Sequence, residues 1–302
     1  MSFIRYPGGK KKFLTQIMEQ LSNHYAACEQ YREPFFGGGS IGLAVLSKGK
    51  MTDFWVNDKD VAMRCLWQSV AQFSQSFIRR VQRFTPSVVQ FDEFRASLAQ
   101  QPLSPMSEAE IVETGFRKLA VHQMSFSGLG EKSGGPLGGR EQDEHTKYAI
   151  DCRWSPQSIC KKVTHYSYLM NNTKFKVTDL DFIDLIECDA LKALIYLDPP
   201  YFDKGADLYI HSFDQADHER LADALKNTNH KWILSYDDCL EVRKLYEWAH
   251  IEQFAGTYTI KQTKGTKSDP DWLVKQKTEL LIMPHNMKIE RHNFDEIFGL
   301  LL

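Results

Sequence analysis

Disulfide and metal-binding patterns are missing from this sequence of 302 residues. The six cysteines form no C-x-x-C pair, and the ten histidines show no H-E-x-x-H or other metal spacing. The cysteines are therefore expected to be reduced thiols of a cytoplasmic protein, not zinc ligands or a disulfide framework. No metal site is predicted.

Long apolar segments are also missing. No run of 18 apolar residues offers a membrane span, and the polar, basic N-terminus has no signal-peptide core. Hydrophobic residues still make up 42% of the chain, which is long enough for one core and a smaller subdomain. We expect a globular protein without a membrane partner.

An overall positive charge is the third absence, because the formal net charge is −2. Positive charge is nevertheless gathered locally. The first thirteen residues hold one arginine and three lysines without an acid, and residues 261–277 hold five lysines against two aspartates. Such segments can follow a phosphate backbone. On charge alone, a solvated surface is the preferred interpretation.

The most informative segment is Asp-Pro-Pro-Tyr at 198–201, which follows the apolar run 193–197. Prolines lack an N–H donor and force extended backbone on the preceding residue. They would fix the Asp198 carboxylate, nearby carbonyl oxygens and the Tyr201 ring at a strand's carboxyl end, where open α/β sheets bind ligands. Such a cluster suits a flat base with an exocyclic amine. A proline-stopped strand with a surface acid remains the alternative.

A glycine pattern lies earlier in the chain. Gly37, Gly39 and Gly42 satisfy G-x-G-x-x-G, which allows a tight turn and close approach of a ligand to the backbone. A short helix over 41–46 and a strand ending at Asp58 are predicted to follow. An acid in that place can accept hydrogen bonds from both ribose hydroxyls. A plain glycine turn explains the pattern alone equally well.

Four blocks together resemble a known family, the alpha-group (Dam-type) DNA adenine-N6 methyltransferases. They are residues 6–10 (Tyr-Pro-Gly-Gly-Lys), 33–40 (Glu-Pro-Phe-Phe-Gly-Gly-Gly-Ser), 57–58 (Asn-Asp) and 198–201. Their order, with the catalytic block late, is typical of the alpha group. Weaker similarity continues through 232–236 and 279–282.

The resemblance implies a site-specific enzyme that transfers a methyl group from S-adenosylmethionine to the N6 amine of a flipped adenine in duplex DNA. The catalytic residues would be Asp198, Pro199 and Tyr201. Hydrogen bonds from the amine to the Asp198 carboxylate and the Pro199 carbonyl would free its lone pair, and the Tyr201 ring would stack on the base.

The family's cofactor residues map onto Tyr6, Lys10, Phe35, Gly37, Gly39, Asp58, Asp179 and Asp198. The resemblance places Tyr6 and Lys10 at the methionine end of the cofactor and Asp58 at the ribose. It places Asp179 near the adenine amine, although Asp179 could equally be a helix N-cap.

The predicted fold class is α/β, a Rossmann-like adenosylmethionine-dependent methyltransferase core with an inserted helical target-recognition subdomain. The core would comprise 1–60 and 173–302, and the insertion 61–172. Strands are expected near 31–35, 53–57, 174–178, 193–197, 231–235 and 279–283. Helices are expected over 11–25, 61–84, 91–99, from a capping box at Ser107 to Met124, and from Asp214 to Leu225.

The insertion contains a glycine-rich loop, 125–140, in which six of the sixteen residues are glycine. We expect it not to fold on itself, because ordering costs about 1–2 kcal/mol per residue, and to order on duplex DNA. The predicted DNA-binding residues are Lys132, Arg140, Lys264 and Lys267. A cognate restriction endonuclease is an optional partner. Three alternatives remain: a cytosine-N4 or RNA methyltransferase, an inactive DNA-binding relative, and a dehydrogenase with the same glycine pattern.

Overall fold

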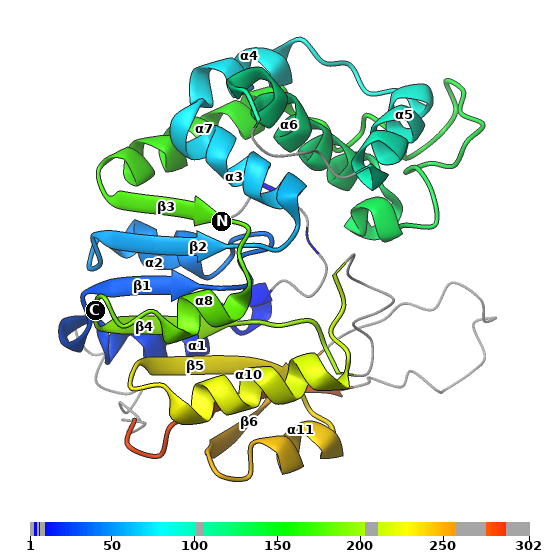
Figure 1. Cartoon of the computed structure of the whole chain (residues 1–302). Coiled ribbons are helices and arrows are strands. Elements are labelled where there is room, and N and C mark those ends of the chain that lie inside the picture. The colour runs from blue at the N-terminus through cyan, green and yellow to red at the C-terminus, as the bar shows by residue number, and fades with distance from the viewer. Residues whose placement is uncertain are drawn as a thin grey trace, which may run out of the picture.

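A seven-stranded sheet organises the described part of the chain (Figure 1). The computed structural model describes residues 3–4, 6, 10–100, 106–202, 211–257 and 276–287. The strand order is β3-β2-β1-β4-β5-β7-β6, with the first five strands parallel and β7 antiparallel to both neighbours. The strands are β1 Gln30–Glu33, β2 Asp53–Asn57, β3 Lys174–Thr178, β4 Ala193–Leu197, β5 Lys231–Asp237, β6 His250–Thr257 and β7 Gln276–Met283. This confirms the predicted α/β, Rossmann-like fold class.

The sequence predicted six of these strands and missed β6. Among the described strands it lies at the edge of the sheet and pairs with β7, and its residues 250–253 are all at least partly exposed. Its sequence, His-Ile-Glu-Gln-Phe-Ala-Gly-Thr, therefore lacks the continuous apolar run that marks the buried strand β4.

Both faces of the sheet are covered, as the fully buried β4 requires. Leu194 and Tyr196 pack into a core that includes residues of α1 (Leu14–Ser22) and α2 (Gly42–Lys48). Ile195 and Leu197 point to the other face, where they pack with α8 (Phe182–Glu187), α10 (Gln215–Asn227) and α11 (Leu240–Leu245). The alternation follows from the two-residue period of a strand.

In the described part of the segment between β2 and β3, five α-helices gather at the β3 end of the sheet (Figure 1). They are α3 Val61–Gln72, α4 Ser74–Gln82, α5 Val88–Ala99, α6 Glu108–Met124 and α7 Pro156–Asn171. The predicted capping box at Ser107 is present. The helix predicted over 61–84 is wrong as one element, because the backbone leaves the helical conformation at Phe73. These helices share a hydrophobic core with the sheet, and the boundaries of the insertion stay a prediction.

The helix predicted over 11–25 is shorter than expected. The α-helical part is α1, and a 3-10 turn flanks it on each side, η1 (Lys10–Lys12) and η2 (Tyr25–Ala27). The helix predicted over 41–46 begins and ends later, as α2. The turn η1 places Lys10 beside Asp198, at the carboxyl end of β4, and the Lys10 side chain is only 2% exposed there.

The expectation that loop 125–140 does not fold on itself is wrong. Two 3-10 turns, η3 (Phe126–Gly128) and η4 (Gly130–Lys132), lie within it. The Leu137 N–H donates to the Met124 carbonyl at 2.7 Å, and the Gly130 N–H donates to the Ser125 hydroxyl at 3.0 Å. Gly130 has φ +60°, and a β-carbon there would lie 2.5 Å from the buried His122 ring. Gly130 therefore allows the loop to pack closely on α6.

Candidate functional site

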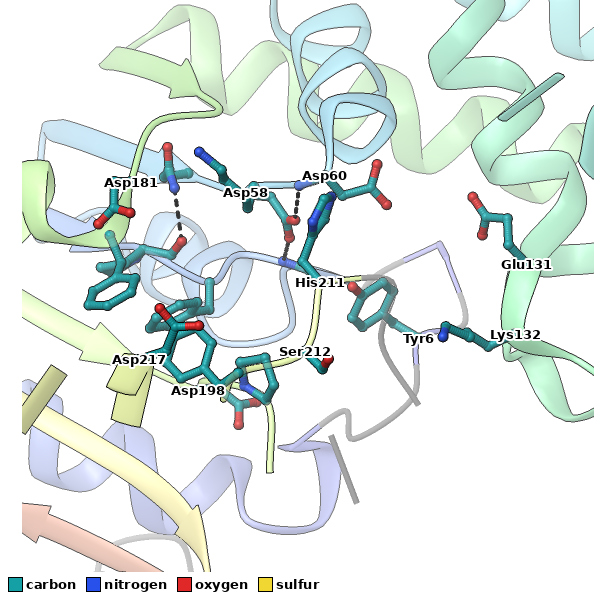
Figure 2. Close-up of a pocket in the computed structure, with 18 of the residues that line it drawn as sticks. Tyr6, Asp58, Asp60, Glu131, Lys132, Asp181, Asp198, His211, Ser212 and Asp217 are labelled. Carbon is teal, nitrogen blue, oxygen red and sulfur yellow. Dashed lines mark hydrogen bonds between the residues drawn. The ribbon is translucent and has the colours of Figure 1, made fainter. Parts of the chain in front are cut away.

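A cavity of about 380 Å³ lies at the carboxyl ends of β1, β2 and β4 (Figure 2). From β1 the chain continues to β2 and β3 on one side, while β4 and β5 lie on the other, so the strand order reverses at this edge. Ligands of open α/β sheets bind at such a switch point, and the volume falls within the ~300–1,000 Å³ of ligand pockets.

Aromatic side chains form one end of the cavity. Phe35 follows β1, Phe182 opens α8 and Phe213 precedes α10, and all three line the cavity. The ring centroid of Phe35 lies 5.6 Å from that of Phe182 and 5.5 Å from that of Phe213. Tilted and edge-on rings at this spacing are favourable and leave apolar surface for a flat ligand ring.

The glycine loop lies beside this end. Gly37 has φ +45° and Gly39 has φ +66°, a conformation that favours glycine. A β-carbon on Gly37 would lie 2.8 Å from the Tyr6 ring, so the absence of a side chain lets Tyr6 pack on the loop. The Trp67 indole N–H donates to the Gly37 carbonyl at 2.8 Å, which ties the loop to α3.

Asp58 follows β2 and lines the centre of the cavity. Its Oδ2 accepts the Gly37 N–H at 2.7 Å and its Oδ1 accepts the Asp60 N–H at 3.0 Å (Figure 2). Burial, and then the nearby Asp60 carboxylate, raises the pKa of Asp58 to about 7. The carboxyl group joins the end of β2 to the glycine loop, and its remaining lone pairs are available to hydroxyl donors.

Asp198 follows β4 and lines the cavity together with Pro200. Its Oδ1 lies 3.0 Å from Lys10 Nζ, and the Ser235 hydroxyl donates to the same oxygen at 3.4 Å. Burial raises the pKa of Asp198 to about 6, and Lys10 opposes that rise. Pro199 is buried and is not among the described residues that line the cavity.

Behind Asp198, Lys10 is the centre of a buried network. Its Nζ donates to the Tyr201 hydroxyl at 2.9 Å and to Glu279 Oε2 at 3.1 Å, and the Tyr201 hydroxyl donates to Glu279 Oε1 at 2.8 Å. Burial alone would lower the pKa of Lys10, but Asp198, Tyr201 and Glu279 together raise it well above its usual value. The lysine is therefore charged, and it holds Asp198 in place.

Tyr201 and Glu279 occupy places that the sequence did not indicate. Tyr201 is only 4% exposed and is not among the cavity-lining residues that the structure describes. Glu279 comes from β7, which is antiparallel to β5. Two signals were available for Glu279: it is a lone acid at the start of the apolar run 280–283, and it lies in the segment 279–282 of weaker family similarity.

Asp179 forms an ion pair with Arg64 at 3.3 Å and is not among the described cavity-lining residues. Its neighbours Leu180 and Asp181 line the cavity instead. The N-cap of α8 is Asp181, which accepts the Ile183 N–H at 3.0 Å. The cofactor role of Asp179 stays a prediction.

Charged residues form the other end of the cavity, and sequence reasoning missed most of them. Lys118 on α6 is 2% exposed, and its Nζ lies 2.6 Å from Asp60 and 2.7 Å from Glu131. Burial opposes its charge, but these two carboxylates raise the pKa of Lys118 to about 12. Lys132, predicted to bind DNA, also lines this end (Figure 2).

His122 on α6 lines the cavity next to these charged residues. Its ring stacks on that of Tyr6, with centroids 5.4 Å apart, and its Nδ1 lies 3.1 Å from the Gly128 carbonyl. Burial, and then the Lys118 charge, lowers the pKa of His122 to about 4. The neutral ring donates from Nδ1 and so joins Tyr6 to loop 125–140.

The other predicted DNA-binding residues lie away from the cavity or outside the description. Arg140 is exposed and forms a two-pronged pair with Asp92, at 2.5 and 3.1 Å. Lys264 and Lys267 lie outside the described residues. Among the described residues, no group of three or more His, Cys, Asp or Glu side chains could hold a metal ion, and no helix is long and apolar enough to cross a membrane.

Comparison with known proteins agrees with this geometry. The model of one family, described as D12 class N6 adenine-specific DNA methyltransferase, matches residues 6–260. The match begins at Tyr6 and includes the glycine loop, Asp58 and the Asp-Pro-Pro-Tyr segment. It confirms the predicted family. No curated protein matches the chain.

Proposed function

Because the chain belongs to the D12 class family of N6 adenine-specific DNA methyltransferases, we propose that it transfers a methyl group from S-adenosylmethionine to the N6 amine of an adenine flipped out of duplex DNA. The observation that carries this proposal is the position of Asp198. Its carboxylate is held by Lys10 in the wall of a cavity that also contains Asp58 and an aromatic end. An acceptor and a cofactor-sized space thus share one cavity.

The cavity fits adenosylmethionine part by part. The aromatic end formed by Phe35, Phe182 and Phe213 suits the adenine ring, and the partly buried Asp58 suits the ribose hydroxyls. The glycine loop offers close approach at Gly37. When bound, the cofactor supplies an electrophilic methyl group on a positively charged sulfur.

Asp198 acts as the acceptor of the adenine amine. The amine is a poor nucleophile because its lone pair is delocalised into the ring. When the amine donates one hydrogen bond to the Asp198 carboxylate and another to the Pro199 carbonyl, its nitrogen can pyramidalise and present that lone pair. The positive charge that develops on nitrogen is stabilised by a carboxylate already fixed in place, and the surplus proton passes to that carboxylate. A pKa of about 6 leaves Asp198 ionised at neutral pH.

Lys10 and Tyr201 act as positioning residues for Asp198. Lys10 contacts Asp198, Tyr201 and Glu279 at once, and Tyr201 is almost fully buried. This arrangement supports a role for the Tyr201 hydroxyl in holding Lys10, in place of the stacking role that the family resemblance implied.

DNA would approach from the side of the helices between β2 and β3. Loop 125–140 of that segment supplies Leu129, Glu131 and Lys132 to the cavity wall and carries Phe126, which is 62% exposed. We assign target recognition to residues 61–172 on this basis. A partner endonuclease is not required for the reaction.

Replacing Asp58 by alanine is expected to weaken adenosylmethionine binding by roughly 1.5–3 kcal/mol, as for a lost hydrogen bond to a charged group. Isothermal titration calorimetry measures this effect. Asp223→Ala, an exposed position on α10, is the matched control and should bind as the wild type does. Tight binding of NADH with no binding of adenosylmethionine would contradict the proposal and favour a dehydrogenase.

A further inference from the structure

At the end of the cavity opposite the aromatic rings, no charged side chain has been assigned to a part of the cofactor. The family resemblance gave Lys10 to the methionine end of the cofactor, but Lys10 is 2% exposed and already contacts Asp198, Tyr201 and Glu279. Tyr6 does line this end. If the adenine ring takes the aromatic end and the ribose takes Asp58, the amino-acid part must find its partners beyond Asp58.

Glu131 provides a negative charge there. Both of its carboxylate oxygens accept hydrogen bonds from Lys118 Nζ, at 2.7 and 2.9 Å, and Lys118 also contacts Asp60 at 2.6 Å. One buried cation between two carboxylates leaves one net negative charge on this group of three side chains. A carboxylate has about four lone-pair sites, so Glu131 can still accept hydrogen bonds from a ligand.

Lys132, the next residue in η4, provides a positive charge on the same wall. Its ammonium group and the Glu131 carboxylate both lie at the end of the cavity where Tyr6 stands (Figure 2). Charges of opposite sign on one wall of the cavity match a zwitterion, which carries an ammonium and a carboxylate on one carbon atom.

We propose that Glu131 and Lys132 bind the amino-acid end of the cofactor. Glu131 would accept hydrogen bonds from the cofactor's ammonium group, and Lys132 would donate to the cofactor's carboxylate. The inference rests on the proposed function and extends it, because both residues belong to the loop to which DNA contact was assigned. Loop 125–140 then closes the cofactor cavity as well as facing DNA. Lys118 keeps Glu131 in place, and the link from Lys118 through Asp60 reaches the ribose-binding Asp58.

Calorimetry with three nucleosides tests this assignment without relying on catalysis. S-adenosylhomocysteine carries both charged groups, its decarboxylated analogue keeps only the ammonium, and 5′-methylthioadenosine has neither. Glu131→Gln should weaken the first two ligands about 10- to 100-fold, the size of a lost charge-assisted hydrogen bond. Lys132→Met should weaken S-adenosylhomocysteine alone, by about 3- to 10-fold, because Lys132 is exposed.

Binding of 5′-methylthioadenosine should stay within about twofold of wild type in both variants, which also shows that the cavity is folded. Glu144→Gln and Lys147→Met, two exposed positions in the same inter-helix segment, are the controls and should change nothing. Equal loss of all three ligands in Glu131→Gln and Lys132→Met would overturn the assignment. So would unchanged affinity for S-adenosylhomocysteine, and a Lys132→Met effect on DNA affinity alone would return that lysine to DNA binding.

The proposed function has a separate point of failure. Wild-type protein that binds S-adenosylhomocysteine more tightly than 5′-methylthioadenosine meets the condition on which the inference depends. Wild-type protein that binds neither nucleoside would contradict adenosylmethionine as the cofactor, and the assignment of Glu131 and Lys132 would fall with it.

Discussion

Replacing Asp198 by alanine is expected to lower the single-turnover rate of methylation by at least ~10²–10³-fold, the scale of losing one preorganised polar group. The carboxylate is proposed to accept a hydrogen bond from the adenine amine and to stabilise the positive charge that develops on the amine nitrogen. Cofactor affinity should be largely unchanged, because the described contacts of Asp198 go to Lys10 and Ser235 behind it.

Asp198→Asn separates charge from shape. The amide keeps one acceptor oxygen but lacks the negative charge, so its single-turnover rate should also be severely reduced. Asp223→Ala, on the exposed side of α10, should react at the wild-type rate. Wild-type turnover by Asp198→Ala would contradict the mechanism, whereas loss confined to Asp198→Ala would show that an acceptor oxygen suffices without the charge.

Replacing Lys10 by methionine is expected to lower the free energy of unfolding by about 3–5 kcal/mol, because it removes the cation from a buried ionic cluster. Asp198 and Glu279 would then lie close together without the lysine between them. Denaturant unfolding measures the loss. Lys12→Met, at an exposed position of the same turn η1, is the control and should unfold within about 0.5 kcal/mol of wild type.

The pH profile of the same variant tests the link to catalysis. The reaction needs the Asp198 carboxylate, whose pKa is about 6 in the wild type, so the methylation rate should fall as the pH drops through about 6. Lys10 opposes the rise of that pKa, and its removal should raise it further. The acid limb of Lys10→Met should therefore move to higher pH. If the acid limb of a folded Lys10→Met variant stays at the wild-type pH, Lys10 does not control the pKa of Asp198.

Residues that follow apolar runs were predictable from the sequence. Asp58 and Asp198 each come directly after a buried parallel strand, and the carboxyl ends of parallel strands meet at one edge of the sheet. Local sequence alone therefore places them in the cavity. The family resemblance adds their proposed roles, which local sequence does not contain.

Partners from distant elements were not predictable in the same way. Glu279 reaches Lys10 because β7 inserts antiparallel beside β5, and Lys118 reaches Glu131 because loop 125–140 folds back on α6. Both lysines are buried, although lysine is rarely buried unless paired. The pairing that permits this burial depends on tertiary structure. Glycine content similarly predicted a loop that does not fold on itself, whereas the loop contains two 3-10 turns and Gly130 packs closely on His122.

The most direct test of the account is mass spectrometry of the nucleosides from duplex DNA incubated with the protein and isotope-labelled adenosylmethionine. The account predicts labelled N6-methyladenine in the duplex, and none when Asp198→Ala replaces the wild type at equal time. RNA and oligonucleotides without adenine should remain unlabelled. Label in N4-methylcytosine, label in RNA alone, or binding of DNA without any transfer would contradict it.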